Sequence, residues 1–413
     1  MRVSHSQASS ALHTTFSALH HANYRLWFIG QLVSLAGTWM QTTAQGYLVY
    51  ELTQSASFLG YVGFAAGIPS WAFTLYGGLV ADRFSRRTII ILAQAAMMLW
   101  AFILAWLVFS GQVQPWHVVA LALLNGVANA FDAPARQAFV VELVTREDMT
   151  NAIALNSTMF NAAAVLGPAI AGVVYAVFGP AWCFTLNGLS YLAVIAALLL
   201  MHIARVEHSV RRGGVYRQLR QGVSFVAHDS VTRVLTLNMG MLSLFGLSMV
   251  TLFPAWSVDV LHGDVGTNGL LLGARGLGAM AGALLLASVG RRGLRGRLWT
   301  IGSFVMPVAM GLFTLTHWLP LSLLLLVFVG WGFMVIANSS NSLVQTRVPD
   351  ALRGRVMSIF TLTFFGTMPI GSLLIGNIAD RIGEPAIEAI NAGIIFCMSA
   401  LIWLTQPYIR RLE

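Results

Sequence analysis

The chain has 413 residues, of which 57% are apolar and 9% are charged, and this composition excludes an ordinary water-soluble globular protein. Its net charge of +9 would suggest a nucleic-acid partner in a soluble protein, but here the basic residues lie between long apolar segments. All 24 basic residues are arginine, which excludes a Walker A nucleotide-binding loop because that loop requires a lysine.

Apolar stretches long enough to cross a membrane recur along nearly the whole chain. A span needs roughly 20 apolar residues, and in lipid its backbone must satisfy its own hydrogen bonds, so we expect helices. The predicted fold class is an all-α membrane protein with twelve transmembrane helices. The expected spans, in chain order, are residues 24–50, 56–80, 88–110, 116–140, 150–178, 181–202, 232–258, 267–290, 297–316, 319–343, 354–379 and 386–405.

The breaks between these spans divide the chain into five parts. We expect a cytoplasmic tail at 1–22, a six-helix bundle at 23–202, a cytoplasmic linker at 203–230, a second six-helix bundle at 231–405 and a cytoplasmic tail at 406–413. Within the linker, apolar residues recur at helical spacing opposite arginines, which predicts an amphipathic helix at the membrane surface. A solvated linker is the alternative. The apolar positions are Val215, Leu219, Val223 and Val226.

The distribution of arginine predicts the orientation in the membrane. With the N-terminus inside, the even-numbered connections and both tails hold almost all arginines outside the spans, whereas the odd-numbered connections hold only Arg381. Loops on the cytoplasmic side carry an excess of positive charge. We therefore expect a multi-pass membrane protein with both termini in the cytoplasm.

The two halves of the chain match each other at a fixed offset of 204 residues. Seven identical pairs, mostly glycines at expected helix contacts and helix ends, indicate an internal repeat. Two parallel six-helix repeats around a central pathway are typical of secondary transporters. The pairs are Gly78 and Gly282, Arg87 and Arg291, Gly126 and Gly330, Val144 and Val348, Gly167 and Gly371, Gly172 and Gly376, and Gly179 and Gly383.

A dense polar hairpin, Gly78 to Arg87, separates the second and third expected spans. It places one carboxylate and three guanidinium groups at a helix end. Such a cluster can act only as an orientation signal, or it can also join neighbouring helix ends by charge-assisted hydrogen bonds.

This hairpin resembles motif A of the major facilitator superfamily, G-x-L-a-D-R-x-G-R-R, with Val80 in place of the usual leucine and Ser85 in place of the usual glycine. The resemblance implies a conformational latch that holds the outward-open state, centred on Asp82. The matching positions are Gly78, Asp82, Arg83, Arg86 and Arg87. In the second half Leu286 falls where Asp82 would map, so we expect any latch to be one-sided.

The fifth span carries a second motif, which resembles the antiporter motif of the same superfamily, g-x-x-x-G-P-x-x-G-G. Small residues four or five apart allow close helix approach, and a proline removes one backbone bond. Ordinary small-residue packing is the alternative, whereas the resemblance favours export over uptake. The motif positions are Ala163, Gly167, Pro168, Ala171 and Gly172.

The fourth span carries a polar stripe of Asn125, Asn129, Asp132 and Arg136, spaced so that all four share one helix face. An ionisable residue inside a span is a functional hypothesis by default, and Arg136 is the i,i+4 partner of Asp132. We expect this pair to serve proton coupling or a gate, with a purely structural ion pair as the alternative.

Arg275 is the one charge expected close to the middle of the membrane, where it must face protein or water. It would contact an anionic or carbonyl-rich substrate, or form a structural pair with a carboxylate such as Asp132. In the superfamily the first, fourth, seventh and tenth helices line the central cavity. The resemblance therefore implies a cavity lined by Gln41, Asn129, Asn238, Asn338 and Asn341, together with Arg275.

Further sequence from Asn125 to Asn187 resembles the enterobactin-exporter-like branch of the superfamily. The resemblance implies a monomeric exporter of the bacterial inner membrane that exchanges a small organic molecule, such as a siderophore or drug, for protons by rocking its two bundles. It implies no cofactor beyond the proton gradient. An uptake carrier and a lysophospholipid or lipid flippase are alternatives, whereas a membrane enzyme or receptor is disfavoured because no histidine lies deep in a span.

Overall fold

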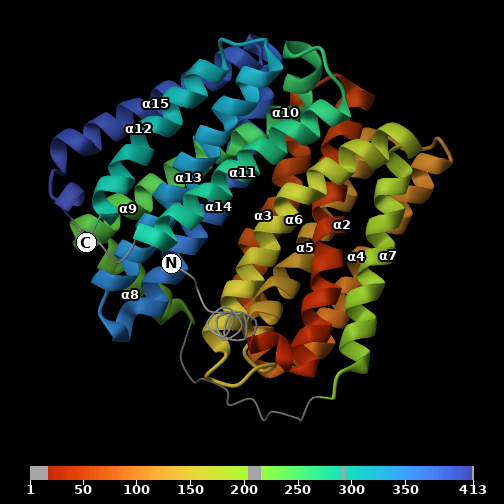
Figure 1. The fold of residues 1–413 in the computed structure, drawn as a ribbon, viewed down its shortest axis with the longest axis horizontal. Helices are drawn as coiled ribbons and strands as arrows, with labels where there is room; N and C mark the ends of the chain where they lie inside the picture. Colours follow the sequence, from red (N-terminus) through yellow and green to blue (C-terminus); the bar gives the residue numbers. More distant parts are fainter. Residues whose placement is uncertain (1–16, 203–214, 290–293, 412–413) are drawn as a thin grey trace, which may run out of the picture. The chain divides into compact units, whose positions relative to one another are not determined.

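The computed structural model describes residues 17–202, 215–289 and 294–411, and every regular element among them is helical (Figure 1). Parts of the two expected tails and residues 203–214 of the expected linker lie outside these ranges. The first half begins with the 3-10 turn η1 (Ser17–His20). Six long helices follow it: α2 (Ala22–Thr53), α3 (Ala56–Arg83), α4 (Arg86–Phe109), α5 (Pro115–Val140), α6 (Met149–Phe178) and α7 (Pro180–Leu200).

The second half has a surface helix and six further helical segments at the expected places. After α8 (Val215–His228) come the broken segment from Ser230 to Val260, then α11 (Val265–Val289), α12 (Arg295–Phe313), α13 (Leu319–Arg347), α14 (Asp350–Ile382), α15 (Glu384–Thr405) and the turn η6 (Ile409–Arg411). Within the described part of the chain, ten helical segments are long and apolar enough to cross a membrane. Helices α2 and α3, of 32 and 28 residues, occupy the other two expected positions.

The seventh expected span is not the continuous helix that the sequence predicted. It consists of α9 (Ser230–Met241), the π-helix η2 (Leu242–Leu247), the 3-10 helix η3 (Ser248–Leu252), the short α10 (Phe253–Ala255) and the π-helix η4 (Trp256–Val260). Pro254 lacks a backbone donor, and its ring prevents a regular turn before it. Changes of helix type of this kind mark strained or functional segments.

Two sharp turns that lie 204 residues apart in the sequence have the same backbone conformation. Gly179 ends α6 with φ +88°, and Gly383 ends α14 with φ +85°. Only glycine adopts these angles without strain. A proline lies in the first turn of the helix that follows each glycine. The α6–α7 and α14–α15 connections therefore reverse the chain in the same way.

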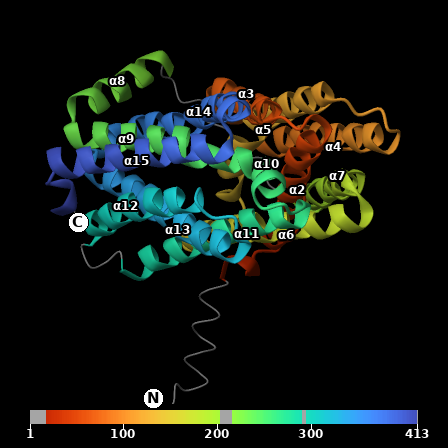
Figure 2. The same cartoon turned by 90° about the horizontal axis from the view of Figure 1, so that it is seen from above.

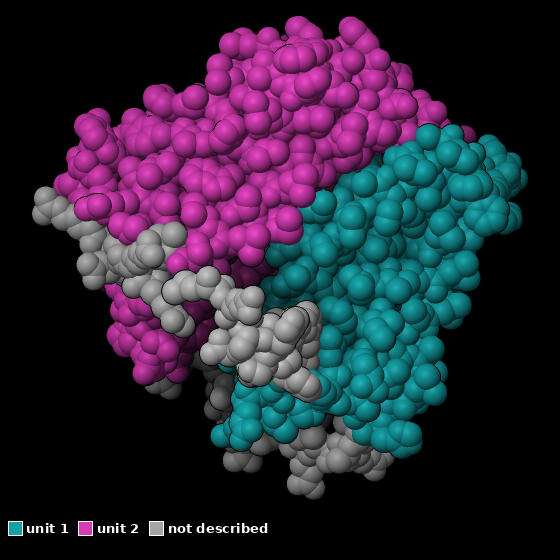
Figure 3. Space-filling view, viewed as in Figure 1, with its two compact units in different colours: residues 1–44, 72–113, 124–210 teal, residues 45–71, 114–123, 211–413 magenta. Residues whose placement is uncertain are grey.

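The described chain forms two compact units, which Figure 3 colours separately. Unit 1 comprises residues 1–44, 72–113 and 124–210, and unit 2 comprises residues 45–71, 114–123 and 211–413. The division passes through α2, α3 and α5, so the first half of α3 belongs to unit 2. In unit 1, the side chains of Trp27, Ile90, Phe139 and Leu198 are buried in one apolar cluster.

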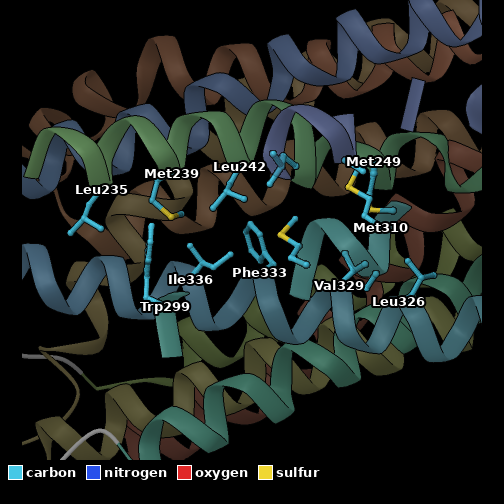
Figure 4. Packing of buried hydrophobic residues seen from close by; sticks show 14 of the residues in the cluster. Leu235, Met239, Leu242, Met249, Trp299, Met310, Leu326, Val329, Phe333 and Ile336 are labelled. Carbon is cyan, nitrogen blue, oxygen red and sulfur yellow. The ribbon is translucent and has the colours of Figure 1, made fainter. Parts of the chain in front are cut away.

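The core of unit 2 is a larger apolar cluster between α9, α12 and α13 (Figure 4). Its labelled members include Leu235, Met239, Trp299 and Phe333, which point toward one another between the helices. The indole nitrogen of Trp299 donates to the Ser340 hydroxyl at 2.9 Å, so the one polar group of this large side chain is satisfied inside the core.

The linker segment forms α8, which packs against α9 and α14 (Figure 2). Phe225 and Val226 lie against the apolar cluster of unit 2, and a Cβ at Gly222 would meet the Arg355 carbonyl oxygen at 2.7 Å. Val223 is exposed. One face of α8 is therefore attached to α14, and Val223 lies on its free surface, where a membrane-surface helix would contact lipid.

Candidate functional site

The hairpin between α3 and α4 ties together helix ends on the predicted cytoplasmic side of unit 1. Arg86 donates to Glu142 at 2.6 Å and to the Ala138 carbonyl at 3.2 Å. Arg87 donates to the Leu199 carbonyl at 3.2 Å. The two arginines therefore join the start of α4 to the ends of α5 and α7. Arg83 is exposed, and the side chain of Asp82 lies outside the described part of the structure.

Two features of this hairpin were missed by sequence reasoning. Glu142, the ion-pair partner of Arg86, lies just beyond α5 and carries no motif signal. The close helix contact is made by Gly77, where a Cβ would lie 2.2 Å from the Ala130 carbonyl oxygen. At Gly78, by contrast, a Cβ would meet no described atom within 4 Å.

Each unit also has an ionic contact close to the predicted cytoplasmic side that lies outside the hairpin. In unit 1, hydrogen bonds from Ser17 and His21 hold the pKa of Asp148 below its usual range, with the His21 ring nitrogen 2.8 Å from the carboxylate. In unit 2, burial opposes but does not outweigh the hydrogen bonds from Arg347 and Thr232, which lower the pKa of Asp229. Arg347 donates to both Asp229 oxygens, at 3.1 and 3.0 Å.

The five residues of the antiporter-like motif are all buried on one face of α6. Gly167 lies at the crossing with α2, where an added Cβ would be 2.4 Å from the Trp39 Cβ, 3.0 Å from the Ala36 oxygen and 3.2 Å from the Met40 nitrogen. The motif is therefore a tight helix contact in unit 1, and no residue larger than glycine fits at position 167 without a shift.

The structure brings Asp132 and Arg136 together within a buried polar network of unit 1. Asp132 is 1% exposed, and its two oxygens lie 3.4 Å from Arg136 Nη2 and 3.1 Å from the Gln94 amide nitrogen that donates to it. Arg136 in turn donates to Gln31 at 3.3 Å. The network therefore joins α2, α4 and α5 and provides the charged form of Asp132 with partners.

Among the expected cavity residues of unit 1, Gln41 is hydrogen-bonded to another helix. Its side-chain oxygen accepts a hydrogen bond from Asn187 of α7 at 2.6 Å, and both residues are buried. Asn129 is half-buried on α5, three residues before Asp132. The structure thus shows Gln41 joining α2 to α7.

The expected cavity residues of unit 2 differ in their surroundings. Asn238 of α9 is buried, and its Oδ1 has no hydrogen-bond partner among the described residues. Asn338 on α13 is exposed, whereas Asn341 accepts a hydrogen bond from Gln345 at 2.5 Å. Arg275 on α11 is partly exposed, but its Nε is enclosed without an acceptor in the described structure.

An apolar groove of about 370 Å³ lies on unit 1 between α3, α4 and α5. Leu92, Trp100, Leu124 and Phe131 are among its lining residues, and none of the predicted site residues lines it. Leu92 and Leu124 are exposed. This groove is therefore separate from the polar network and suits lipid contact.

Within unit 2, the first half of α3 packs closely on α14. A Cβ at Gly60 would lie 2.6 Å from the Ser372 oxygen, and one at Gly67 would lie 2.2 Å from the Pro369 ring. At the predicted outer end, Asp380 accepts hydrogen bonds from the Ala56 and Ser57 backbone at 2.6 and 3.1 Å. A carboxylate of α14 therefore caps the first turn of α3.

Sequence reasoning also missed a buried carboxyl group in unit 2. Glu388 of α15 is 1% exposed, and neither of its oxygens has a hydrogen-bond partner among the described residues. Its spacing with Asn391, Ile395 and Ile402 places it on the buried face of the helix, and that spacing was visible in the sequence. Among the described residues, no group of three His, Cys, Asp or Glu side chains could hold a metal ion.

The sequence matches a known protein family over almost its whole length. The family model, described as a transmembrane secretion effector, matches residues 13–411. The chain belongs to this family of the major facilitator superfamily. The family expected from its motifs is confirmed, and the chain is a multi-pass membrane protein of a transporter family.

Curated relatives extend over nearly the whole chain. The staphyloferrin A transporter of Staphylococcus aureus is 24% identical over 87% of this chain and 90% of its own length. The multidrug efflux pump Tap of Mycobacterium tuberculosis is 29% identical over 92% and 93%. The enterobactin exporter EntS of Citrobacter koseri is 24% identical over 95% and 93%.

A solved structure shows the same fold at low sequence identity. The nucleoside transporter NupG aligns with a TM-score of 0.75 and 12% identity, over 92% of this chain and 98% of its own length. The all-α transporter fold of this superfamily is therefore confirmed.

Proposed function

We propose that this protein is a proton-coupled exporter of a small organic molecule, of the siderophore or drug class, in the bacterial inner membrane. The observation that carries the proposal is the antiporter-like motif on α6, whose five residues are buried and whose Gly167 packs closely against α2. The relatives named as exporters and efflux pumps, which align over nearly the full length, support export as the direction.

Transport proceeds by alternating access, with both termini in the cytoplasm. The contact between the first half of α3 and α14 is the one that separates when the pathway opens to the outside. The Asp380 cap on α3 holds this contact in the present conformation, and the hydrogen bond from Tyr50 to Asp259 joins α2 to η4 on the same predicted side. At the opposite side, Arg86 and Arg87 tie the ends of α4, α5 and α7, and Asp82 is the proposed latch of that side.

We assign the Asp132–Arg136 pair to a gate in the N-terminal half. The pair and its neighbours Gln31 and Gln94 come from three helices, α2, α4 and α5. A change in the packing of these helices therefore breaks charge-assisted hydrogen bonds. Because removal of one partner of a buried ion pair leaves the other charge uncompensated, Asp132→Asn will impair every mode of transport. The half-buried Asn129, the buried Asn238 and the partly exposed Arg275 are the proposed substrate contacts.

The test uses purified protein in lipid vesicles. An imposed pH gradient drives movement of a labelled siderophore or a cationic dye, and exchange of labelled for unlabelled substrate is measured in the same vesicles without a gradient. The proposal predicts gradient-driven movement of the substrate against its concentration in the direction opposite to the protons. Movement with the protons would instead identify an uptake carrier, and movement of a labelled lysophospholipid alone would identify a flippase.

A further inference from the structure

We propose that Glu388 of α15 is the site that binds and releases the transported proton. This assignment rests on the proposed proton coupling and names the residue responsible for it. It concerns the C-terminal half, whereas the motif-bearing residues all lie in the N-terminal half. Glu388 was selected because it is the one fully buried carboxyl group in the described chain whose oxygens have no hydrogen-bond partner.

The burial of Glu388 determines its protonation in this conformation. An ionised carboxylate held in apolar surroundings without a partner is very costly, and the group becomes neutral instead. Asp132 is equally buried, but it has Arg136 and Gln94 as partners for its negative charge. The two buried carboxyl groups therefore differ: a negative charge on Asp132 has partners, whereas one on Glu388 has none among the described residues, so Glu388 carries a proton.

A path of acidic groups leads from the predicted outer surface toward Glu388. Asp259 and Asp380 are exposed, and their charges act on the half-buried Glu384. Glu384 precedes Glu388 by one helical turn, about 6 Å along α15, on the same side of the helix. Burial therefore increases along the series from surface to Glu388, as a proton entry path from the outside requires.

The charged groups on the elements that pack against α15 leave Glu388 without a counter-charge. Helix α15 packs against α12, α14, η2 and α9. Element η2 has no charged residue, and the charged residues of α12 and α9 lie at the opposite, predicted cytoplasmic side. The titratable and charged groups at the predicted outer side of unit 2 are Tyr50 and Glu51 of α2, Asp259 of η4, His262 and Asp264 before α11, His317 between α12 and α13, Asp380 and Arg381 of α14, and Glu384 of α15 itself.

Other buried polar groups lie about one helical turn from the predicted outer ends of their helices, as Glu388 does, and they also lack described hydrogen-bond partners in this conformation. Asn268 and Ser322 each lie one turn from the predicted outer ends of α11 and α13, and both have buried polar atoms without a described partner. The indole nitrogen of Trp256, one turn before the end of η4, is also unpaired in the described structure. Of the irregular segment from Leu242 to Val260, η2 packs against α15, so a rearrangement of this segment changes the surroundings of Glu388.

This difference between conformations provides the coupling. A proton can drive a conformational change only if the two states bind it with different affinity. Glu388 holds its proton while it is buried and unpaired, and it releases the proton to water once a rearrangement opens a water-filled path from the carboxylate to the cytoplasmic side. No other bond is made or broken, and one proton enters from outside for each proton released inside.

Two transport measurements test the assignment. In vesicles, Glu388→Gln mimics the permanently protonated acid. We expect its pH-driven export to fall to the level of empty vesicles, while exchange of labelled for unlabelled substrate without a gradient stays near the wild-type rate. Glu388→Asp keeps a carboxyl group and retains pH-driven export. Asp132→Asn is the matched control and loses both modes.

An infrared measurement tests the protonation directly and does not depend on transport. The C=O stretching band of a protonated carboxyl group at neutral pH will be present in the wild type and in Asp132→Asn, and absent in Glu388→Gln. Retention of this band in Glu388→Gln overturns the assignment, as does pH-driven export or loss of exchange by that variant. If the wild type shows no pH-driven export of any candidate substrate, the proposed function fails, whereas the infrared result still decides whether Glu388 binds a proton.

Discussion

Gly167 offers the sharpest test of the packing that underlies the antiporter-like motif. The perturbation is Gly167→Ala, which adds one methyl group at the crossing of α6 and α2. That methyl group would lie 2.4 Å from the Trp39 Cβ and 3.0 and 3.2 Å from backbone atoms of Ala36 and Met40. Because two of these atoms belong to the backbone of α2, the contact is relieved only if one helix moves.

The expected magnitude follows from two opposing effects. Overpacking in a well-packed interior costs about 1 to 3 kcal/mol, whereas replacing glycine by alanine within a helix contributes roughly 0.5 to 1 kcal/mol of stability. The difference is about 0 to 2.5 kcal/mol, and because two of the close atoms are backbone we expect a net loss in its upper part, about 1 to 2.5 kcal/mol. At about 2 °C per kcal/mol for a larger protein the Tm then falls by roughly 2 to 5 °C.

Thermal unfolding of the purified protein in detergent measures this effect, and α15 provides a matched control. Gly393 also lies within a helix, but a Cβ there would meet no described atom within 4 Å, so Gly393→Ala should leave the Tm unchanged or raise it. A Gly167→Ala protein with a Tm equal to that of Gly393→Ala would refute the packing argument. Export by Gly167→Ala should also slow, because helices α2 and α6 can no longer pack at the wild-type distance.

Three further predictions address the charged groups and the orientation. Glu142→Gln removes the charged partner of Arg86 and should cost about 1 to 2 kcal/mol, whereas replacing the exposed Arg83 by Gln should change the Tm little. Because hydrogen bonds from Arg347 and Thr232 lower the pKa of Asp229 below 3.8, its stabilisation is complete above that pH and is lost as the pH falls through the lowered value. Asp229→Asn should therefore lower the Tm at pH 7 and converge with the wild type in strong acid. In a cysteine-free protein, an impermeant maleimide should label Gln112→Cys in intact cells but Glu147→Cys only after the membrane is permeabilised, and the reverse pattern would contradict the predicted orientation.

The helices were predictable because the physical rule behind them is local. A backbone in lipid must form its own hydrogen bonds, so an apolar run between polar breaks determines a helix and its approximate ends. The positive φ of Gly179 and Gly383 follows equally from residue type at a predicted break. The irregular segment from Leu242 to Val260 was not predictable in the same way, because apolar composition does not distinguish α, 3-10 and π turns.

The candidate site was predictable only where its partners share a helix. The Asp132–Arg136 contact follows from i,i+4 spacing, whereas Gln31 and Gln94 reach the pair from other helices and required the tertiary structure. Gly77 and Gly78 are neighbours of the same type, and only the packing of α5 distinguishes them. Glu388 had a visible position on the buried helix face, but its lack of partners could be known only from the structure.

The internal repeat separates the positions that both halves share from the charged positions that occur in one half only. At the offset of 204 residues, Gly167 and Gly371 both lie at close helix contacts, and Gly179 and Gly383 both form the positive-φ turns that end α6 and α14. The charged positions inside the bundles have apolar or uncharged counterparts: Asp132 maps to Ile336, Arg136 to Ser340, Arg275 to Trp71 and Glu388 to Phe184. Duplicated positions thus build the frame that both halves share. A proton drives a conformational change only if the two conformations bind it with different affinity, which depends on the partners that a carboxyl group has in each conformation. Asp132 keeps Arg136 and Gln94 as partners here, whereas Glu388 has none in the described chain, so Glu388 is the group whose proton affinity a rearrangement would change most.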